Sequence, residues 1–300
     1  MPIDIETETT QLKEYWQQRN EQMEIDRAIL RLTKPKATTD QIQWVSNEPK
    51  VFYETSVALI SSYPPRFRLP LSINFTSEEK NKMNKAERLI VGIFRSLDQR
   101  QWQNSWLRQL AYWTLSGWHA EFVVVKRSGQ DVQFIADVWD PITVYPEWDA
   151  DILTKCVRSL EVDKRTAARL ARGWASKGLE DTYQEDDKKS TVEVINYWRN
   201  DRGKVYNAIM LGGKVIKKLK LENQFQAIPI QVGAIGVPDQ TAADWPVRFG
   251  ENIIATNRDM YEYENQMISL MATIMAETAY PNIITKTQTG APAIKNKGMK

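Results

Sequence analysis

Residues 251–278 read ENIIATNRDMYEYENQMISLMATIMAET, the longest stretch of helical pattern in the chain. Tyr280-Pro281 follows and ends it, since proline cannot continue a helix. We therefore expect one helix from about Glu251 to Thr278, roughly 40 Å long. Its apolar residues recur every seven positions along two adjacent seams. The first seam is Ile253, Met260, Met267 and Ile274, and the second is Ile254, Tyr261, Ile268 and Met275.

Two adjacent seams make a wider apolar surface than a helix packed on one core needs. The pattern favours a helix that packs between identical neighbours, with a core helix of a single domain as the alternative. Four of the apolar positions are methionines, which suit a contact that must adapt or slide. They are Met260, Met267, Met271 and Met275.

Helical patterns also dominate the N-terminal third of the chain. They cover about 9–33, 48–62, 77–99 and 101–116. Asn47 is a suitable cap for the second helix, and Thr76 with Glu79 forms a capping-box pattern before the third. Gly117 is a suitable stop for the fourth.

Strand patterns dominate from there to residue 235. We expect a hairpin of 122–126 and 132–138 around Ser128-Gly129, a strand over 153–162, a helix from Asp163 to about Ser176, and turns at Asp140-Pro141 and Tyr145-Pro146. A meander of 192–198, 205–211 and 215–219 turns tightly at Gly212-Gly213, and another strand covers 228–235. Helices and strands that occupy separate parts of the chain indicate an α+β fold. The breaker-rich stretch 238–246 marks the main architectural boundary.

Composition excludes several classes of function. The chain has 300 residues, 40 Lys and Arg against 38 Asp and Glu, one cysteine and one histidine. A net charge of +2 lacks the basic excess of a protein that grips nucleic acid tightly. Cys156 has no partner for an internal disulfide, and with His119 it cannot build a four-ligand zinc site. No apolar run has the length to cross a bilayer, so we expect no membrane contact.

Motifs for catalysis are also missing. The sequence has no phosphate-binding loop, dinucleotide fingerprint, zinc-protease motif or nucleophile elbow. His119 is expected to be an ordinary residue at the start of a strand. We expect no catalytic residue, no metal and no cofactor, and therefore no enzyme.

One cluster keeps an enzymatic alternative open. Five carboxylates surround Trp139 and Trp148: Asp137, Asp140, Glu147, Asp149 and Asp151. Paired carboxylates beside aromatic rings could serve a carbohydrate hydrolase or hold a divalent cation. The other interpretation is that Asp140 begins a turn and the rest are solvated. The 11 tryptophans are expected to fill a core or an interface, the alternative being a sugar-stacking surface.

Four stretches in this order resemble the portal proteins of tailed bacteriophages, particularly short-tailed ones. They are NEPKVFYETSVALISSYPPRFR (47–68), KAERLIVGIFRSLDQRQWQNSWLRQLAYWTLSGWHAEFVVV (85–125), WDPITVYPEWD (139–149) and FGENIIATNRDMYEYENQMISLMATIMAET (249–278). The third is similar to the family's "DP..VYP" signature. The resemblance covers most of residues 40–280.

The resemblance implies a helical and β-rich wing domain over 1–244, a first stem helix over 245–279 and the start of a clip domain over 280–300. It implies a homo-oligomeric ring of twelve subunits at one capsid vertex, through which double-stranded DNA passes during packaging and ejection. The implied partners are the terminase packaging motor, tail adaptor proteins, and the major capsid and scaffolding proteins. The implied location is the virion, with assembly in the host cytoplasm.

Two further expectations concern the C-terminal end. Residues 282–300 carry lysines and no carboxylate, so we expect them to meet DNA weakly at the channel or clip. These lysines are Lys286, Lys295, Lys297 and Lys300. Portal proteins continue into a second stem helix, a tunnel loop and a crown, so we expect this chain to be C-terminally truncated. The remaining alternatives are another phage structural or adaptor protein, or the tryptophan-rich carbohydrate hydrolase.

Overall fold

The chain divides into two compact units in a computed structural model. The structure describes residues 4–33, 42–63, 76–100, 105–128, 131–173, 191–222, 225–236, 245–279, 283–286 and 292–295. Unit one comprises residues 1–24 and 56–253, and unit two comprises residues 25–55 and 254–300. Helices and antiparallel sheets are both extensive, which confirms the α+β class.

Unit one contains two antiparallel sheets. The three-stranded sheet has the order β2-β1-β8, and the five-stranded sheet has the order β3-β4-β5-β6-β7. The strands are β1 (Trp118–Ser128), β2 (Asp131–Trp139), β3 (Val144–Asp149), β4 (Ile152–Asp163), β5 (Thr191–Asp201), β6 (Lys204–Leu211), β7 (Lys214–Leu221) and β8 (Ile230–Ala234). The predicted hairpin and meander are confirmed. Gly212 and Gly213 both have positive φ (53° and 75°), as a two-residue hairpin of the primed type requires.

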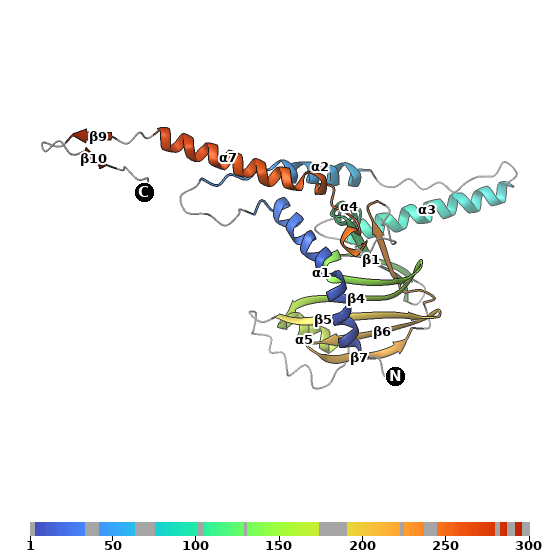
Figure 1. Ribbon diagram of the computed structural model, residues 1–300. Coiled ribbons are helices and arrows are strands. Elements are labelled where there is room, and N and C mark those ends of the chain that lie inside the picture. The colour runs from blue at the N-terminus through green and yellow to red at the C-terminus, as the bar shows by residue number, and fades with distance from the viewer. Residues whose placement is uncertain are drawn as a thin grey trace. The chain divides into compact units, whose positions relative to one another are not determined.

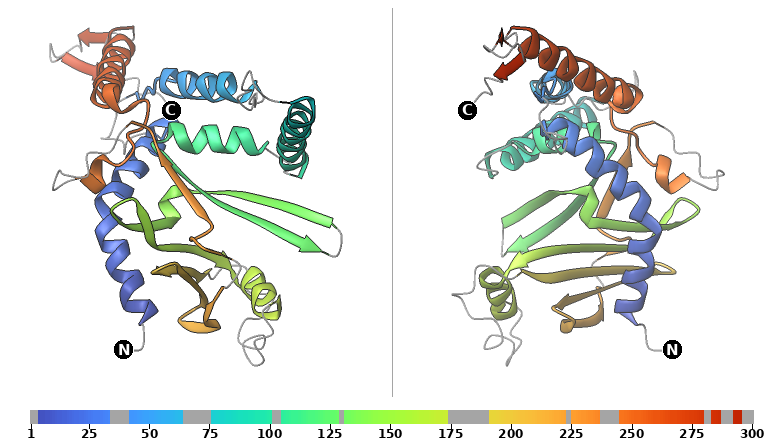
Figure 2. Two further views of the ribbon diagram at one scale, coloured as in Figure 1. Left: turned by 90° about the vertical axis from the view of Figure 1, so that its right-hand side faces the viewer. Right: turned by 60° about the vertical axis from the view of Figure 1, so that its left-hand side comes forward.

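The five-stranded sheet is covered on both faces (Figure 1 and Figure 2). Helix α1 (Ile5–Leu30) crosses one face, where Ile5 and Leu12 pack with Val157 and Tyr197. Helix α5 (Lys164–Gly173) covers the other face through Ala167 and Ala168. Successive strand residues point to opposite faces, so β5 contributes Ile195 and Tyr197 to one core and Val192 and Val194 to the other.

The remaining elements are helices and a small hairpin. They are α2 (Glu48–Ser61), α3 (Ser77–Arg100), α4 (Trp106–Leu115), η1 (Pro141–Thr143), α6 (Trp245–Arg248), η3 (Ala255–Asn257), α7 (Arg258–Ala279), β9 (Ile283–Lys286) and β10 (Pro292–Lys295). The predicted capping box is present before α3, where the amide of Thr76 donates to Glu79 (2.8 Å) and the amide of Glu79 donates to Thr76 (3.3 Å). Asp163 caps α5 as expected, by accepting from the amide of Thr166 at 2.7 Å.

Tryptophans fill the largest core, as predicted. Trp16 of α1 is completely buried, and its ring contacts Trp118, Trp148, Trp245 and Phe249 with centroids 5.4–6.2 Å apart. Its indole N–H donates to the carbonyl of Pro146 on β3 at 2.9 Å. One aromatic residue therefore joins α1 to the edge of the five-stranded sheet.

Several predicted boundaries were wrong. The long helix begins at Arg258 instead of Glu251, because residues 251–254 are not helical and a single 3-10 turn follows them. Tyr145-Pro146 is not a turn but part of β3. Proline is tolerated there because β3 is an edge strand, where a missing N–H costs no ladder hydrogen bond.

The compact units do not coincide with the predicted division at residue 244. Their C-terminal boundary lies between Ile253 and Ile254, and residues 25–55 belong with the C-terminal segment. The hydrogen bonds between residues 42–46 and α7 explain that grouping. The portal names for these regions stay a proposal.

Two glycines allow two backbone segments of unit one to touch, one after α4 and one after α6. Gly117 (φ 128°) and Gly250 (φ 65°) lie so close that a Cβ on either would overlap the backbone carbonyl of the other. The buried guanidinium of Arg19 donates to the carbonyls of Phe249 (2.7 Å) and Gly250. The amide of Ile253 then donates to the carbonyl of Leu115 at 3.1 Å. The chain is thus held in place just before it leaves unit one.

We expect Gly250→Ala to lower the free energy of unfolding by about 3 kcal/mol or more, because the added methyl overlaps a backbone carbonyl that cannot move aside cheaply. Gly203→Ala is the matched control. Gly203 also has positive φ (82°), but nothing lies within 4 Å of the place that a Cβ would take, so only the left-handed backbone strain of about 1 kcal/mol remains. Urea unfolding of both variants measures the difference, and equal losses would contradict the close-packing argument.

Candidate functional site on helix α7

Helix α7 is fixed at its first residue by a partly buried ion pair within unit two. Arg258 donates to both carboxylate oxygens of Asp26, through Nε at 2.6 Å and Nη2 at 3.1 Å. The Asp26 side chain is only 1 % exposed. A two-point contact between a guanidinium and a carboxylate fixes orientation as well as position. The direction in which α7 leaves its first turn is therefore set by Asp26 within the same unit.

A segment of unit two lies along one side of α7 and is bound to it through side chains. Residues 42–46, here called the strap, have no helix or strand structure of their own. The strap amides donate to acceptors on α7, in antiparallel order. Ile42 donates to Thr273 (3.0 Å), Trp44 to Ser269 (2.9 Å) and Ser46 to Asn265 (2.7 Å).

The spacing of these bonds follows from backbone geometry. Two residues of extended chain advance about 6.6 Å, and four residues of helix advance about 6.0 Å. Every second strap amide therefore lies opposite every fourth residue of α7, because these two advances differ by less than about 1 Å. Asn265, Ser269 and Thr273 form a polar stripe that supplies the acceptors a strand neighbour would otherwise provide.

The opposite side of α7 is apolar and exposed. At about 100° per residue, the centre of this apolar set lies roughly 160° around the helix from Ser269. Its side chains are between 44 % and 68 % exposed. They are Met260, Tyr263, Met267, Leu270, Met271, Ile274 and Met275. Helix α7 thus has its polar stripe against its own chain and its apolar face outward, the reverse of a surface helix on a globular core.

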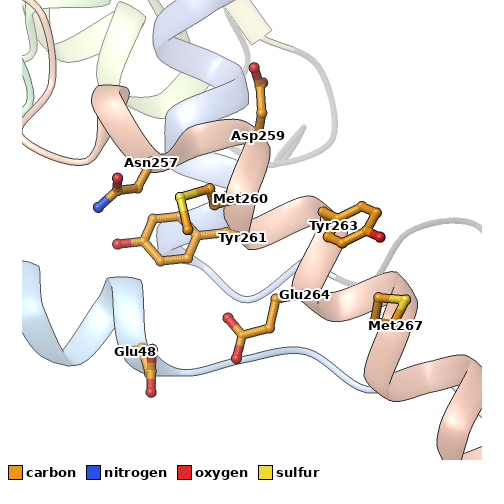
Figure 3. A pocket seen from close by; sticks show the side chains of 8 residues that line it. All are labelled: Glu48, Asn257, Asp259, Met260, Tyr261, Tyr263, Glu264 and Met267. Atoms are coloured by element: carbon orange, nitrogen blue, oxygen red, sulfur yellow. The ribbon is translucent and has the colours of Figure 1, made fainter.

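A groove of about 770 Å³ opens along the N-terminal half of α7 (Figure 3). Its lining combines apolar side chains with three carboxylates and includes no lysine or arginine. The first turn of α2 contributes Glu48, and the remaining residues come from η3 and α7. They are Asn257, Asp259, Met260, Tyr261, Tyr263, Glu264 and Met267. A lining that mixes apolar side chains with carboxylates favours an occupant that carries both apolar groups and positive charge.

The two predicted seams become one broad face in the structure. Met260, Met267 and Ile274 of the first seam are exposed, while Tyr261 and Ile268 of the second are half-buried and Met275 is exposed. Ile253 and Ile254 were wrongly placed on the helix, because they precede its start. Ile254 is 1 % exposed, so its side chain is buried within the subunit and cannot contact a neighbouring copy.

The carboxylates around Trp139 and Trp148 have separate roles. Asp140 caps a 3-10 turn by accepting from the amide of Ile142 at 3.1 Å. Glu147 accepts from Lys155 at 3.2 Å. Asp149 and Asp151 flank the β3–β4 turn, and Asp137 lies exposed on β2.

The two tryptophans of this cluster belong to the core. Trp139 is 4 % exposed, with Phe122 stacked on its ring and the guanidinium of Arg158 4.4 Å from its centroid. Trp148 packs on Trp16 and Phe249. Trp139 therefore has no open ring face for a sugar, while the half-buried Trp148 takes part in core packing.

The remaining titratable groups singled out by the sequence are structural. His119 lies at the start of β1 as predicted, with Nδ1 2.9 Å from the Thr114 hydroxyl, and burial lowers its pKa. Cys156 is fully buried, and desolvation raises the pKa of its thiol. A buried, protonated thiol is a poor nucleophile. In the part of the chain that the structure describes, no group of three or more His, Cys, Asp or Glu side chains could hold a metal ion.

The tail lysines lie outside the residues whose side chains the structure describes. Lys286 and Lys295 are the last residues of β9 and β10, which pair antiparallel, and Lys297 and Lys300 fall beyond the described segments. Their DNA contact stays a prediction. Among the described helices, none combines the length and the apolar character needed to span a bilayer.

No protein-family model matches the chain, and no curated protein matches it. What α7 does is therefore inferred from its own residues and their geometry.

Sequence reasoning missed the strap and its acceptors. The signal was present, because Asn265, Ser269 and Thr273 recur every fourth residue on the side opposite the methionines. The sequence does not reveal which segment donates to these three side chains, because the strap lies 219–231 residues away in the chain.

We expect alternating amide exchange along the strap. The amides of Ile42, Trp44 and Ser46 are bound to α7, whereas no such bond is seen from Gln43 or Val45 to a described residue. Because one hydrogen bond contributes about 1 kcal/mol, the bound amides are expected to exchange roughly fivefold more slowly. Residue-resolved hydrogen exchange measures this, and Ser269→Ala is expected to release Trp44 selectively. Uniform exchange across 42–46 would contradict the register.

Proposed function

We propose that this chain is a structural subunit of a bacteriophage portal that closes into a ring with copies of itself through the exposed face of α7. The ordered resemblance over residues 47–68, 85–125, 139–149 and 249–278 supports the family. An α+β region followed by a single long helix agrees with a wing domain and a first stem helix. Residues 280–300 would then begin the clip.

The observation that carries the proposal is the outward apolar face of α7. Seven large apolar side chains, from Met260 to Met275, are exposed on one side of a 22-residue helix. Soluble proteins seldom leave so continuous an apolar patch in water unless another molecule covers it. The strap already occupies the opposite side, so the face is available to a neighbouring subunit.

A ring meets this need because identical subunits in a closed ring touch head-to-tail through two different patches. Every apolar face is then covered and none is left over. In this proposal the ring, with twelve subunits in the family, conducts double-stranded DNA. A terminase motor supplies the ATPase activity that this sequence has no phosphate-binding loop to provide.

The proposed portal function also implies contacts with other virion proteins and with DNA. Tail adaptor proteins would dock at the clip, and capsid and scaffolding proteins would surround the wing in the virion. The balanced charge agrees with a channel through which DNA slides without being gripped. The tail lysines are the candidates for loose, salt-sensitive contact with the DNA backbone.

We expect Met260→Asp and Met267→Asp each to turn rings into folded, smaller species. Each change puts a carboxylate into a contact that becomes desolvated on assembly, at a cost of several kcal/mol per interface. Sedimentation velocity measures the assembly, and circular dichroism measures folding. Unit one has its own core, so its helix and strand signals are expected to stay.

Ile152→Asp is the matched control, because Ile152 is 60 % exposed on β4 and lies outside α7. It makes the same apolar-to-acidic change and is expected to leave assembly unaltered. If the α7 variants and the control behave alike, or if the α7 variants still form rings of the wild-type size, the assignment of α7 is wrong.

A further inference from the structure

The N-terminal half of α7 carries an excess of negative charge. Asp259, Glu262 and Glu264 lie within two turns of one another, and Arg258, the only cation of the helix, is already paired with Asp26. Two α7 helices packed side by side at this level would bring like charges together, which opposes association. The surface that covers Met260 and Met267 must therefore carry apolar groups and positive charge together.

Helix α3 offers such a surface on its outer side. Lys85, Arg88 and Arg95 are exposed there, and no described residue forms an ion pair with any of them. Between them lies Leu89, whose residue is 61 % exposed. The inner side of α3 packs in unit one through Ile93, Phe94 and Leu97. The outer side is thus cationic around one large apolar side chain.

A glycine in the middle of the same side is the second indication. Gly92 lies inside a 24-residue helix, where glycine costs stability relative to alanine. The described part of its own chain gives no reason for the missing side chain, because none of it lies within 4 Å of the position that a Cβ would take. A glycine on an exposed helix face permits a bulky side chain of another molecule to approach the backbone closely.

We propose that the outer face of α3 in one copy docks on the acidic, methionine-bearing half of α7 in the next copy. In this arrangement Arg88 and Arg95 meet Asp259 and Glu264, and a large side chain of the α7 face enters the notch at Gly92. The contact is head-to-tail, as a ring requires. It rests on the proposed ring function and names the two patches that make the ring.

The other basic surfaces in the described part of the chain fit less well. Helix α5 has cations but turns its small apolar residues, Ala167 and Ala168, onto the five-stranded sheet. Strand β7 carries Lys218 and Lys220 at a sheet edge, where lysines ordinarily discourage pairing with other strands. Among these surfaces, α3 alone combines exposed cations, an exposed leucine and a missing side chain on one helical face.

Charge reversal tests the pairing directly. We expect Arg88→Glu with Arg95→Glu to weaken subunit association at least about tenfold, and Asp259→Lys with Glu264→Lys to do the same. Mixing the two doubly substituted proteins is expected to restore association between unlike chains. Lys204→Glu with Lys218→Glu, at exposed positions of β6 and β7, is the control and is expected to change nothing.

Gly92→Ala separates the interface from folding. Alanine raises the stability of an exposed helix, so the variant monomer is expected to melt at a higher temperature than the wild type. Its association is expected to weaken, because the methyl fills the notch. A variant that is more stable and assembles normally would overturn the proposal.

The outcomes distinguish this inference from the proposed function. Rings of normal stability from all α3 variants would remove α3 from the interface and leave the ring function standing. A wild-type chain that stays monomeric would contradict the ring itself. Leu89→Cys and Tyr263→Cys, on two chains of different tagged mass, add a last check, since Cys156 is buried. An α3–α7 disulfide between unlike chains supports the proposal, and its absence in assembled rings overturns it.

Discussion

Three backbone amides of the strap donate to Asn265, Ser269 and Thr273, and this contact decides what the rest of α7 can do. The strap binds the hydrogen-bond acceptors of the polar stripe, so these side chains are satisfied within the chain itself. The apolar residues are then left on the opposite side, where they stay exposed. Asp26 and Arg258 hold the start of the helix, so the exposed face has a defined orientation within the unit. Helix α7 therefore presents its apolar side to water, and we propose that a neighbouring copy covers it.

Within unit one, close backbone packing holds the segment up to Ile253. The paired glycines Gly117 and Gly250 allow two backbone segments to touch, and Arg19 satisfies the carbonyls that this contact buries. Trp16 lies on α1, as Arg19 does, and it connects this helix to the sheet edge through a hydrogen bond to Pro146. The aromatic residues of this core therefore pack against one another and hold α1 on the sheet edge.

Local chemistry made much of the fold predictable, and the candidate site only in part. The capping box at Thr76 and Glu79 and the cap at Asp163 specify their structures within a few residues. The turn predicted at Tyr145-Pro146 was wrong, because the local sequence does not distinguish a proline in an edge strand from a proline in a turn. The start of α7 was missed because residues 251–254 continue the apolar periodicity, while the amide of Ile253 is bound to Leu115. Whether the methionines of α7 face a core or water depends on the strap, which is too distant in sequence to be inferred.

We propose that copies of this chain cover one another's α7 faces in a closed ring. Native mass spectrometry of the wild-type protein tests it most directly, since it counts subunits without assuming a shape. We expect one dominant species whose mass is a fixed multiple of the chain mass, stable on dilution and lost at high salt and mild denaturant together. A monomer at all concentrations, with α7 still helical, would contradict it.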